Sequence, residues 1–71
     1  MPYDYSKLLG RIKECGKTQE SLAFEIGTST STMSQKLNNK GAFTQSEMRR
    51  ISTSLAIPKE EIGAYFFAEQ V

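Results

Sequence analysis

Apolar residues recur at helical spacing in five stretches of the chain, and no stretch shows the alternation of apolar and polar residues that marks a strand. The first stretch follows Asp4, a good helix N-cap because its carboxylate accepts hydrogen bonds from the free backbone N–H groups of a first turn. Leu8, Ile12 and Cys15 then lie on one helical stripe. Gly16 suits the left-handed residue that ends many helices, so the pattern predicts a helix between Asp4 and Gly16.

The second stretch has a clear beginning and a clear end. Thr18 is a favourable N-cap residue, and Gly27 tolerates the positive φ of a helix terminus. Between them, Leu22, Ala23 and Ile26 form one apolar face. The side chain of Ala23 is small, as a close crossing of two helices requires. We therefore expect a short helix that packs tightly against a neighbour.

The third stretch, residues 29–38, consists mainly of hydroxyl-bearing and amide side chains. Met33 and Leu37 are its apolar pair, one helical turn apart. An alternative is that the Ser/Thr run at residues 28–32 is a flexible linker, but a linker does not require an apolar pair at this spacing. Turn-forming residues follow at 38–41. The pattern favours a helix over residues 29–38.

The fourth and fifth stretches begin with N-terminal helix signals. Thr44 and Glu47 match a capping box, in which each side chain accepts a hydrogen bond from the backbone N–H of the other. Pro58 suits the first turn of a helix, because its missing N–H would be unpaired there. The apolar residues that follow are Met48, Ile51 and Leu55 in the fourth stretch and Ile62, Tyr65 and Phe66 in the fifth.

Together these elements predict an all-α fold, a compact five-helix domain that spans residues 1–71. A chain of 71 residues forms one domain, and at this size about 60% of the unfolded surface is buried. The second and third helices are short and meet at Gly27, which predicts a helix-turn-helix. In that motif the first helix packs across the DNA backbone and the second lies in the major groove.

The polar face of the third helix suits contact with base edges. A Gln side chain pairs with adenine through two hydrogen bonds, and Ser or Thr donates to or accepts from any base. Ser and Thr are mediocre helix formers, so the five at residues 28–32 cost stability. A binding role would explain that cost. We therefore expect the helix near residues 29–38 to read duplex DNA.

The sequence at this point resembles a known family. Residues 18–27, with their Gln-Glu-Ser-Leu-Ala start and terminal Gly, followed by residues 28–37, are similar to the helix-turn-helix core of lambda-type phage repressors and Cro proteins. The whole chain resembles short Gram-positive phage proteins, often labelled Cro-like, that open like residues 1–10 (MPYDYSKLLG) and end like residues 62–67. The resemblance implies a lambda-repressor-like fold and a sequence-specific repressor that regulates transcription by occupying operator DNA.

The resemblance also implies roles for individual residues. The base-reading positions would be Thr30, Ser31 and Gln35. Gln19 would bond a phosphate at a helix N-terminus, and Asn38 would contact the DNA backbone where the third helix leaves the groove. From their positions alone, we add Lys36 and Lys40 as further phosphate contacts.

The charge of the chain is nearly balanced, with nine basic and eight acidic residues and a formal net charge of +1. Residues 1–40 carry six basic and four acidic residues, a net +2, and residues 41–71 carry three and four, a net −1. This distribution permits an anionic partner near the N-terminal half without demanding one. We interpret Arg49 and Arg50 as surface or ion-pair residues rather than as a second DNA contact.

Chemistry other than binding finds little support in the sequence. The lone cysteine, Cys15, rules out an intramolecular disulfide, suits a small buried residue and favours a reducing compartment. The chain has no histidine and its carboxylates are scattered, so we expect no metal, no cofactor and no enzymatic activity. No apolar run approaches the roughly 20 residues of a membrane span, and residues 1–10 lack a signal-peptide core. We expect no membrane contact and a location in the bacterial host cytoplasm.

The last residues of the chain are rich in aromatic side chains. Ile62 and Phe66 are expected to close the core, which leaves Tyr65, Phe67 and Val71 on other faces. Exposed aromatic residues near one end of a small domain indicate a partner surface. A homodimer would fit, since paired recognition helices about 34 Å apart match two half-sites one helical turn apart.

Two functions therefore stay open. The first is a Cro-like repressor that reads operator DNA with the helix near residues 29–38. The second is a modulator of the same fold that binds protein, for example an antirepressor that covers the DNA-binding domain of a phage repressor. Three features favour this second function: the near-neutral charge, the aromatic C-terminal stretch, and the short side chains of Thr30 and Ser31, where repressors frequently carry glutamine.

Overall fold

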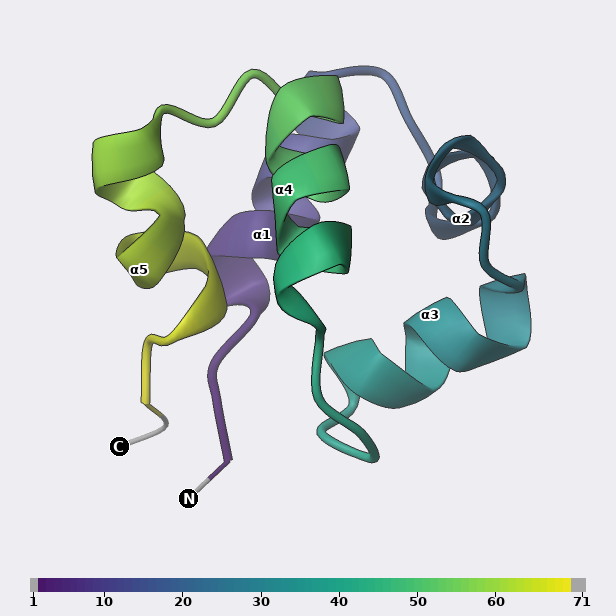
Figure 1. Ribbon diagram of the computed structural model, residues 1–71, viewed down its shortest axis with the longest axis horizontal. Coiled ribbons are helices and arrows are strands. Elements are labelled where there is room, and N and C mark those ends of the chain that lie inside the picture. The colour runs from purple at the N-terminus through teal and green to yellow at the C-terminus, as the bar shows by residue number, and fades with distance from the viewer. Residues whose placement is uncertain (1, 70–71) are drawn as a thin grey trace.

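The computed structural model describes residues 2–69, and across them it contains five α-helices and one 3₁₀ helix (Figure 1). These are α1 (Ser6–Glu14), α2 (Gln19–Ile26), α3 (Thr30–Leu37), α4 (Gln45–Ser54), the 3₁₀ helix η1 (Lys59–Glu61) and α5 (Ile62–Phe66). Extended backbone in this part of the chain pairs at one antiparallel bridge, between Tyr3 and Glu69. The predicted all-α, five-helix fold is confirmed. Of the helices described, none has the length and apolar character to cross a bilayer.

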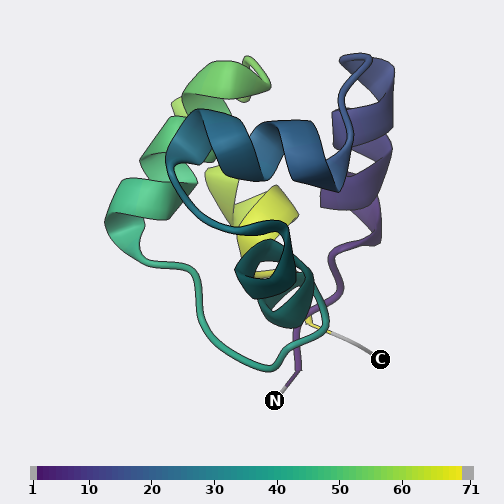
Figure 2. The same ribbon diagram turned by 90° about the vertical axis from the view of Figure 1, so that its right-hand side faces the viewer.

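The helices divide the molecule into two sides. α4 stands in the middle, with the α2–α3 pair on one side and α5 on the other, while α1 lies behind α4 (Figure 1). Seen from the side of α2 and α3, α2 crosses in front of the core and α3 points toward the viewer (Figure 2). The arrangement leaves the outer faces of α2 and α3 free for contact with a partner.

Local hydrogen bonds set the helix ends where the sequence predicts them. Thr18 Oγ1 accepts from the Ser21 N–H at 3.0 Å, and Ser21 Oγ accepts from the Thr18 N–H at 2.9 Å. Thr44 and Glu47 form the predicted capping box, with distances of 3.1 and 2.9 Å. Gly27 ends α2 with a φ of +79°. These contacts satisfy N–H groups that a helix cannot pair internally.

The start of α1 differs from the prediction by one residue. Tyr5 occupies the N-cap position, without a capping bond from its side chain, and its ring is buried in the core. Asp4 Oδ1 accepts from the Ser6 N–H at 2.8 Å, so the carboxylate still satisfies a donor of the first turn. Hydrogen bonds from the side chain and backbone of Ser6 hold the pKa of Asp4 below its ordinary value.

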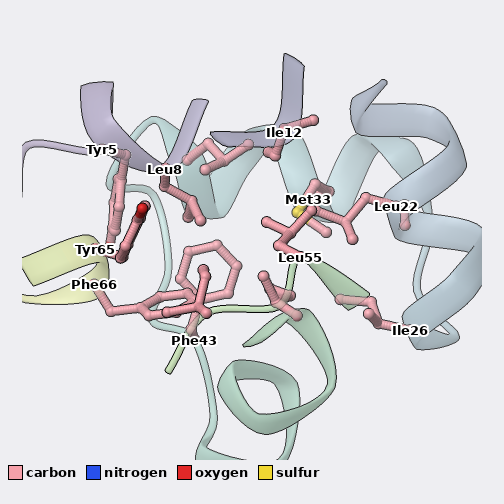
Figure 3. Packing of buried hydrophobic residues seen from close by; sticks show 14 residues of the cluster. Tyr5, Leu8, Ile12, Leu22, Ile26, Met33, Phe43, Leu55, Tyr65 and Phe66 are labelled. Atoms are coloured by element: carbon pink, nitrogen blue, oxygen red, sulfur yellow. The ribbon is translucent and has the colours of Figure 1, made fainter. Parts of the chain in front are cut away.

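Side chains from all five α-helices meet in one core (Figure 3). Its largest fully buried side chains are Leu8, Leu22, Met33, Ile51, Leu55 and Phe66. Phe43, from the loop between α3 and α4, packs edge to face against Tyr5 and Phe66, with ring centroids 5.6 and 5.5 Å apart. Such pairs add to the energy of apolar burial. The sequence pattern did not predict Phe43 in the core, because it lies in a loop outside any periodic stretch.

Asn39 ties the end of α3 to the N-terminal segment. Its φ of +63° places it in the left-handed region, within the turn predicted at residues 38–41. Its side chain accepts a hydrogen bond from the Tyr3 N–H at 2.8 Å and donates one to the Tyr3 carbonyl at 2.9 Å. Tyr3 also forms the bridge with Glu69. Three segments therefore meet at one place: the first described residues, the end of α3 and the last described residues.

The C-terminal aromatic residues correct one prediction. Tyr65, expected on an outer face, is only 8% exposed and belongs to the core, because α5 is covered by α1 on one side and by α4 on the other. The ammonium of Lys7 lies 4.8 Å from the centre of its ring. Phe66 is buried and Phe67 is 48% exposed, as predicted. Val71 lies outside the described residues. Of the three residues assigned to a partner surface, Phe67 alone is seen exposed within residues 2–69.

Candidate binding surface on α2 and α3

Residues 27–29 form a tight turn between α2 and α3. Gly27 supplies the left-handed backbone conformation, which residues other than Gly and Asn adopt only with strain. The Thr28 N–H donates to the Ala23 carbonyl at 2.9 Å, and Ser29 Oγ accepts from the Thr32 N–H at 3.1 Å. Each end of the turn is therefore fixed by hydrogen bonds, which holds α3 at a defined angle to α2.

α3 has a buried face and an exposed face, as predicted. Met33 is 1% exposed, and Leu37 is buried one turn further along. Thr30, Ser31 and Gln35 point outward, and their side chains form no hydrogen bond to any of residues 2–69. The exposed face of α3 therefore offers free donors and acceptors on a helix that is held in place from beneath.

Two residues assigned to the DNA backbone occupy different surroundings. Gln19 is the first residue of α2 and is half-buried there. Asn38 caps the other end of the motif, because its Nδ2 donates to the Ser34 carbonyl at 2.9 Å. That bond uses part of the amide of Asn38 to satisfy the C-terminal turn of α3. The contacts of both residues with DNA stay predictions.

Lys36 is held by a carboxylate of the next helix. Its Nζ donates to Glu47 Oε1 at 2.5 Å and to Glu47 Oε2 at 2.6 Å, and both side chains are largely buried. Burial raises the pKa of Glu47, but hydrogen bonds from Lys36 and from the Thr44 N–H outweigh it and hold the pKa below its ordinary value. Glu47 thus caps α4 and neutralises Lys36 at the same time. A phosphate contact by Lys36 would have to compete with this ion pair.

The other basic groups near the turn are also bound within the chain. Lys17 Nζ donates to both carboxylate oxygens of Glu25, at 2.8 and 2.9 Å. Hydrogen bonds from Lys17 and then from Ser54 hold the pKa of Glu25 below its ordinary value. Arg50 Nη1 donates to the Ile26 carbonyl at 3.1 Å, where a cation suits the negative end of the α2 dipole.

The α2–α3 region consequently has no excess of positive charge. Residues 17–47 carry three lysines and three glutamates. Lys17 and Lys36 are paired, and Lys40 is exposed without an ion pair to any of residues 2–69. A surface built to grip DNA phosphates usually carries clustered basic residues. Here the charges of residues 17–47 balance, Arg50 at the turn adds one cation, and hydroxyl and amide groups occupy the exposed face of α3.

Phe24 is a further exposed residue that the sequence pattern did not single out. It is 86% exposed on α2. Leu22, Ala23 and Ile26 fill the buried face of that helix, and at 100° per residue Phe24 falls opposite to them. The helical period of α2 is therefore enough to predict that Phe24 is exposed. An aromatic side chain so exposed is an anchor that protein interfaces frequently use.

The described residues contain no cluster of His, Cys, Asp or Glu that could hold a metal ion. Cys15 is half-buried against the core, with its Sγ 3.7 Å from the Leu55 carbonyl oxygen. Side chains that could carry chemistry are thus spread over the molecule, whereas groups suited to recognition gather on α2 and α3.

Two comparisons place the chain among known proteins. The model of the family described as "Protein of unknown function (DUF739)" matches residues 1–69. The chain is also similar to the solution structure of the modulator of repression (MOR) of the temperate bacteriophage TP901-1 from Lactococcus lactis. The two are 40% identical, the match covers 94% of this chain and 90% of that one, and the TM-score is 0.79.

The matches refine the resemblance to phage regulators. No curated protein matches the chain. The similar structure is that of a phage modulator of repression, and neither it nor the family model is described as a Cro protein or a lambda-type repressor. A phage regulatory relative is therefore supported, whereas the Cro-like assignment is not. The chain belongs to the DUF739 family and is related to the TP901-1 modulator of repression.

Proposed function

We propose that this chain is a phage regulator that binds a phage repressor protein through the exposed faces of α2 and α3, and that it modulates repression in this way. The observation that carries the proposal is the internal neutralisation of that surface. Two of its three lysines hold glutamates of the same chain, and the third, Lys40, is exposed at the α3–α4 loop.

The charge balance bears on the choice between DNA and protein. Most of the affinity of a protein for duplex DNA comes from lysines and arginines that displace counterions from phosphates. Breaking the bond between Lys36 and Glu47 to free a cation would expose a half-buried carboxylate near the phosphates. Loss of the ion pair and exposure of the Glu47 carboxylate to phosphates are both unfavourable. Little electrostatic affinity for DNA is therefore left at the α2–α3 surface.

The same surface suits a protein partner. Its exposed centre on α3 consists of Thr30, Ser31 and Gln35, which make neutral hydrogen bonds, and Phe24 on α2 adds a large apolar area. Protein interfaces typically join a few aromatic anchors with uncharged hydrogen-bonding groups. The relationship to a modulator of repression makes a repressor the natural partner of this chemistry.

Complex formation with a purified phage repressor from the same phage tests the proposal. Isothermal titration calorimetry without DNA is expected to show a complex. Ser31→Arg should weaken it by about tenfold or more, because a long cation would be inserted into a neutral contact. Ser46→Arg is the matched control, since Ser46 is also an exposed helical serine but lies on α4. Equal effects of the two substitutions, or no complex at micromolar concentration, would contradict the proposal.

Direct reading of operator DNA is the second candidate, favoured by the free donors and acceptors of Ser31 and Gln35. Fluorescence titration against operator and random duplexes distinguishes the two functions. The proposal expects equally weak binding to both, with a log–log salt slope of about −1 to −2, because Lys40 and Arg50 are the cations of this region without an ion pair among residues 2–69. A preference for operator with a slope of about −3 to −4 would establish the Cro-like function instead.

A further inference from the structure

Residues of α4, of the segment that follows it and of η1–α5 line a hollow of about 690 Å³. α5 lies on the opposite side of α4 from α3 (Figure 1). Met48, Ile57, Ile62 and Phe67 supply the apolar wall of this hollow, which we call the α4–α5 groove. None of its lining residues comes from α2 or α3. It is therefore separate from the surface to which the proposed function assigns the repressor.

The apolar surface of the groove extends beyond it. Met48 and Phe67 also line a second hollow of about 590 Å³, which continues toward Tyr3 and Phe43. Phe67 stands between the two and is 48% exposed. Its ring packs edge to face on Tyr3, with centroids 5.7 Å apart, so it is held in place while one side faces solvent. An elongated apolar surface of this kind suits a helix better than a small molecule.

The charged residues on the groove are of one sign. Arg49 and Lys59 line it, and no acidic residue does. Both are exposed, and within residues 2–69 neither takes part in an ion pair or in a side-chain hydrogen bond, unlike Lys17, Lys36 and Arg50. An apolar floor with free cations at its side is complementary to apolar side chains flanked by carboxylates.

Ser52, on α4, is one of the polar residues that line the groove. It is 7% exposed, and its Oγ has no hydrogen-bond partner among the described residues. Buried hydroxyl groups are rarely left unpaired in native proteins.

We propose that the α4–α5 groove is a second docking site, and that it binds an acidic amphipathic helix of a partner protein. Apolar residues of that helix, spaced at i, i+3 or i+4 and i+7, pack between Met48 and Phe67. Its carboxylates pair with Arg49 and Lys59. Because the groove lies between two helices, the ridge of a third helix fits it in the manner of helix–helix packing.

A library of displayed 16-residue helical peptides, with randomised faces, is the probe. Selection on the full chain, followed by counter-selection on the Arg49→Glu/Lys59→Glu variant, should enrich peptides with an apolar stripe flanked by Asp or Glu. The most enriched peptide is then titrated into the ¹⁵N-labelled chain. Amide shifts are expected at Met48, Ser52 and Phe67 and not along α3.

The matched control is the Lys13→Glu/Lys40→Glu variant, which changes the net charge equally but leaves the groove intact. The groove variant should weaken binding of the peptide by about tenfold or more, and the control by about twofold or less. Circular dichroism of both variants establishes that they fold. Because all four substituted side chains are exposed or lie at a turn, wild-type spectra are expected.

Four outcomes would overturn the inference. The first three are enriched peptides without an acidic and apolar pattern, amide shifts along α3, and equal weakening of binding by the two double variants. The fourth is a shift of the groove amides with protein concentration alone, which would assign the groove to a second copy of this chain. None of these results would bear on the α2–α3 surface, whose test uses the repressor and Ser31.

Discussion

The α2–α3 surface and the α4–α5 groove differ in what their basic residues do. In the first, Lys17 and Lys36 hold glutamates of the same chain. In the second, Arg49 and Lys59 have no ion pair within residues 2–69. A basic side chain already bound to a carboxylate attracts an external anion weakly, whereas a free one steers it. We therefore expect an anionic partner to prefer the groove, where both lining cations are unpaired within residues 2–69.

The strongest way to separate the two regions is to remove an apolar side chain from each. Met33→Ala should lower the free energy of unfolding by about 2–5 kcal/mol, because Met33 is 1% exposed and supports α3 from beneath. Phe67→Ala should cost less than about 1.5 kcal/mol, because the ring is already half-exposed. Urea denaturation of the two variants measures the difference. Equal losses would mean that the groove is part of the core.

A smaller effect on stability is expected from Glu47→Ala, which removes the carboxylate that pairs with Lys36 of α3. Loss of the capping bond and of the Lys36 partner should lower the free energy of unfolding by about 2 kcal/mol. The freed Lys36 should also steepen the salt dependence of duplex DNA binding by about one unit of log–log slope. Glu61→Ala removes the same charge from exposed η1 and should change neither quantity appreciably. An unaltered salt slope in Glu47→Ala would show that Lys36 does not reach DNA even when released.

The smallest effect concerns pH. Glu25 and Glu47 have pKa values below the ordinary 4.5, so their bonds stabilise the fold fully above that pH and are lost as the pH falls through their folded pKa values. The urea midpoint should therefore decrease as the pH is lowered below about 5. Glu47→Gln should flatten this decrease, and Glu61→Gln should not. A midpoint that is constant down to pH 3 in the wild type would contradict the assignment.

The sequence predicted what depends on neighbours within one helical turn. Thr18, Gly27 and the Thr44–Glu47 box act on backbone groups at most four residues away, and each is found where it was expected. The Met33–Leu37 pair likewise needs only the helical period to define the buried face of α3. These local signals sufficed for the fold and for the orientation of the candidate surface.

What the sequence missed depends on contacts between distant segments. Phe43 is buried because the N-terminal Tyr5 and the C-terminal Phe66 both reach it, and Tyr65 because α5 is covered on two sides. The ion pair of Lys36 escapes the sequence pattern because its partner Glu47 lies eleven residues away across a turn. Periodicity alone cannot show that a surface cation already has a carboxylate beside it.

The junction at Tyr3 bears on how this protein is labelled. Asn39 clasps Tyr3, and Tyr3 bridges Glu69, so a tag fused at either end of the chain is tethered close to the exit of α3. A bulky fusion there is expected to shield the α2–α3 surface, whereas an environment-sensitive dye there would report when a partner occupies that surface. Purification handles that are cleaved off, or dyes coupled to the outer side of α1, avoid this interference.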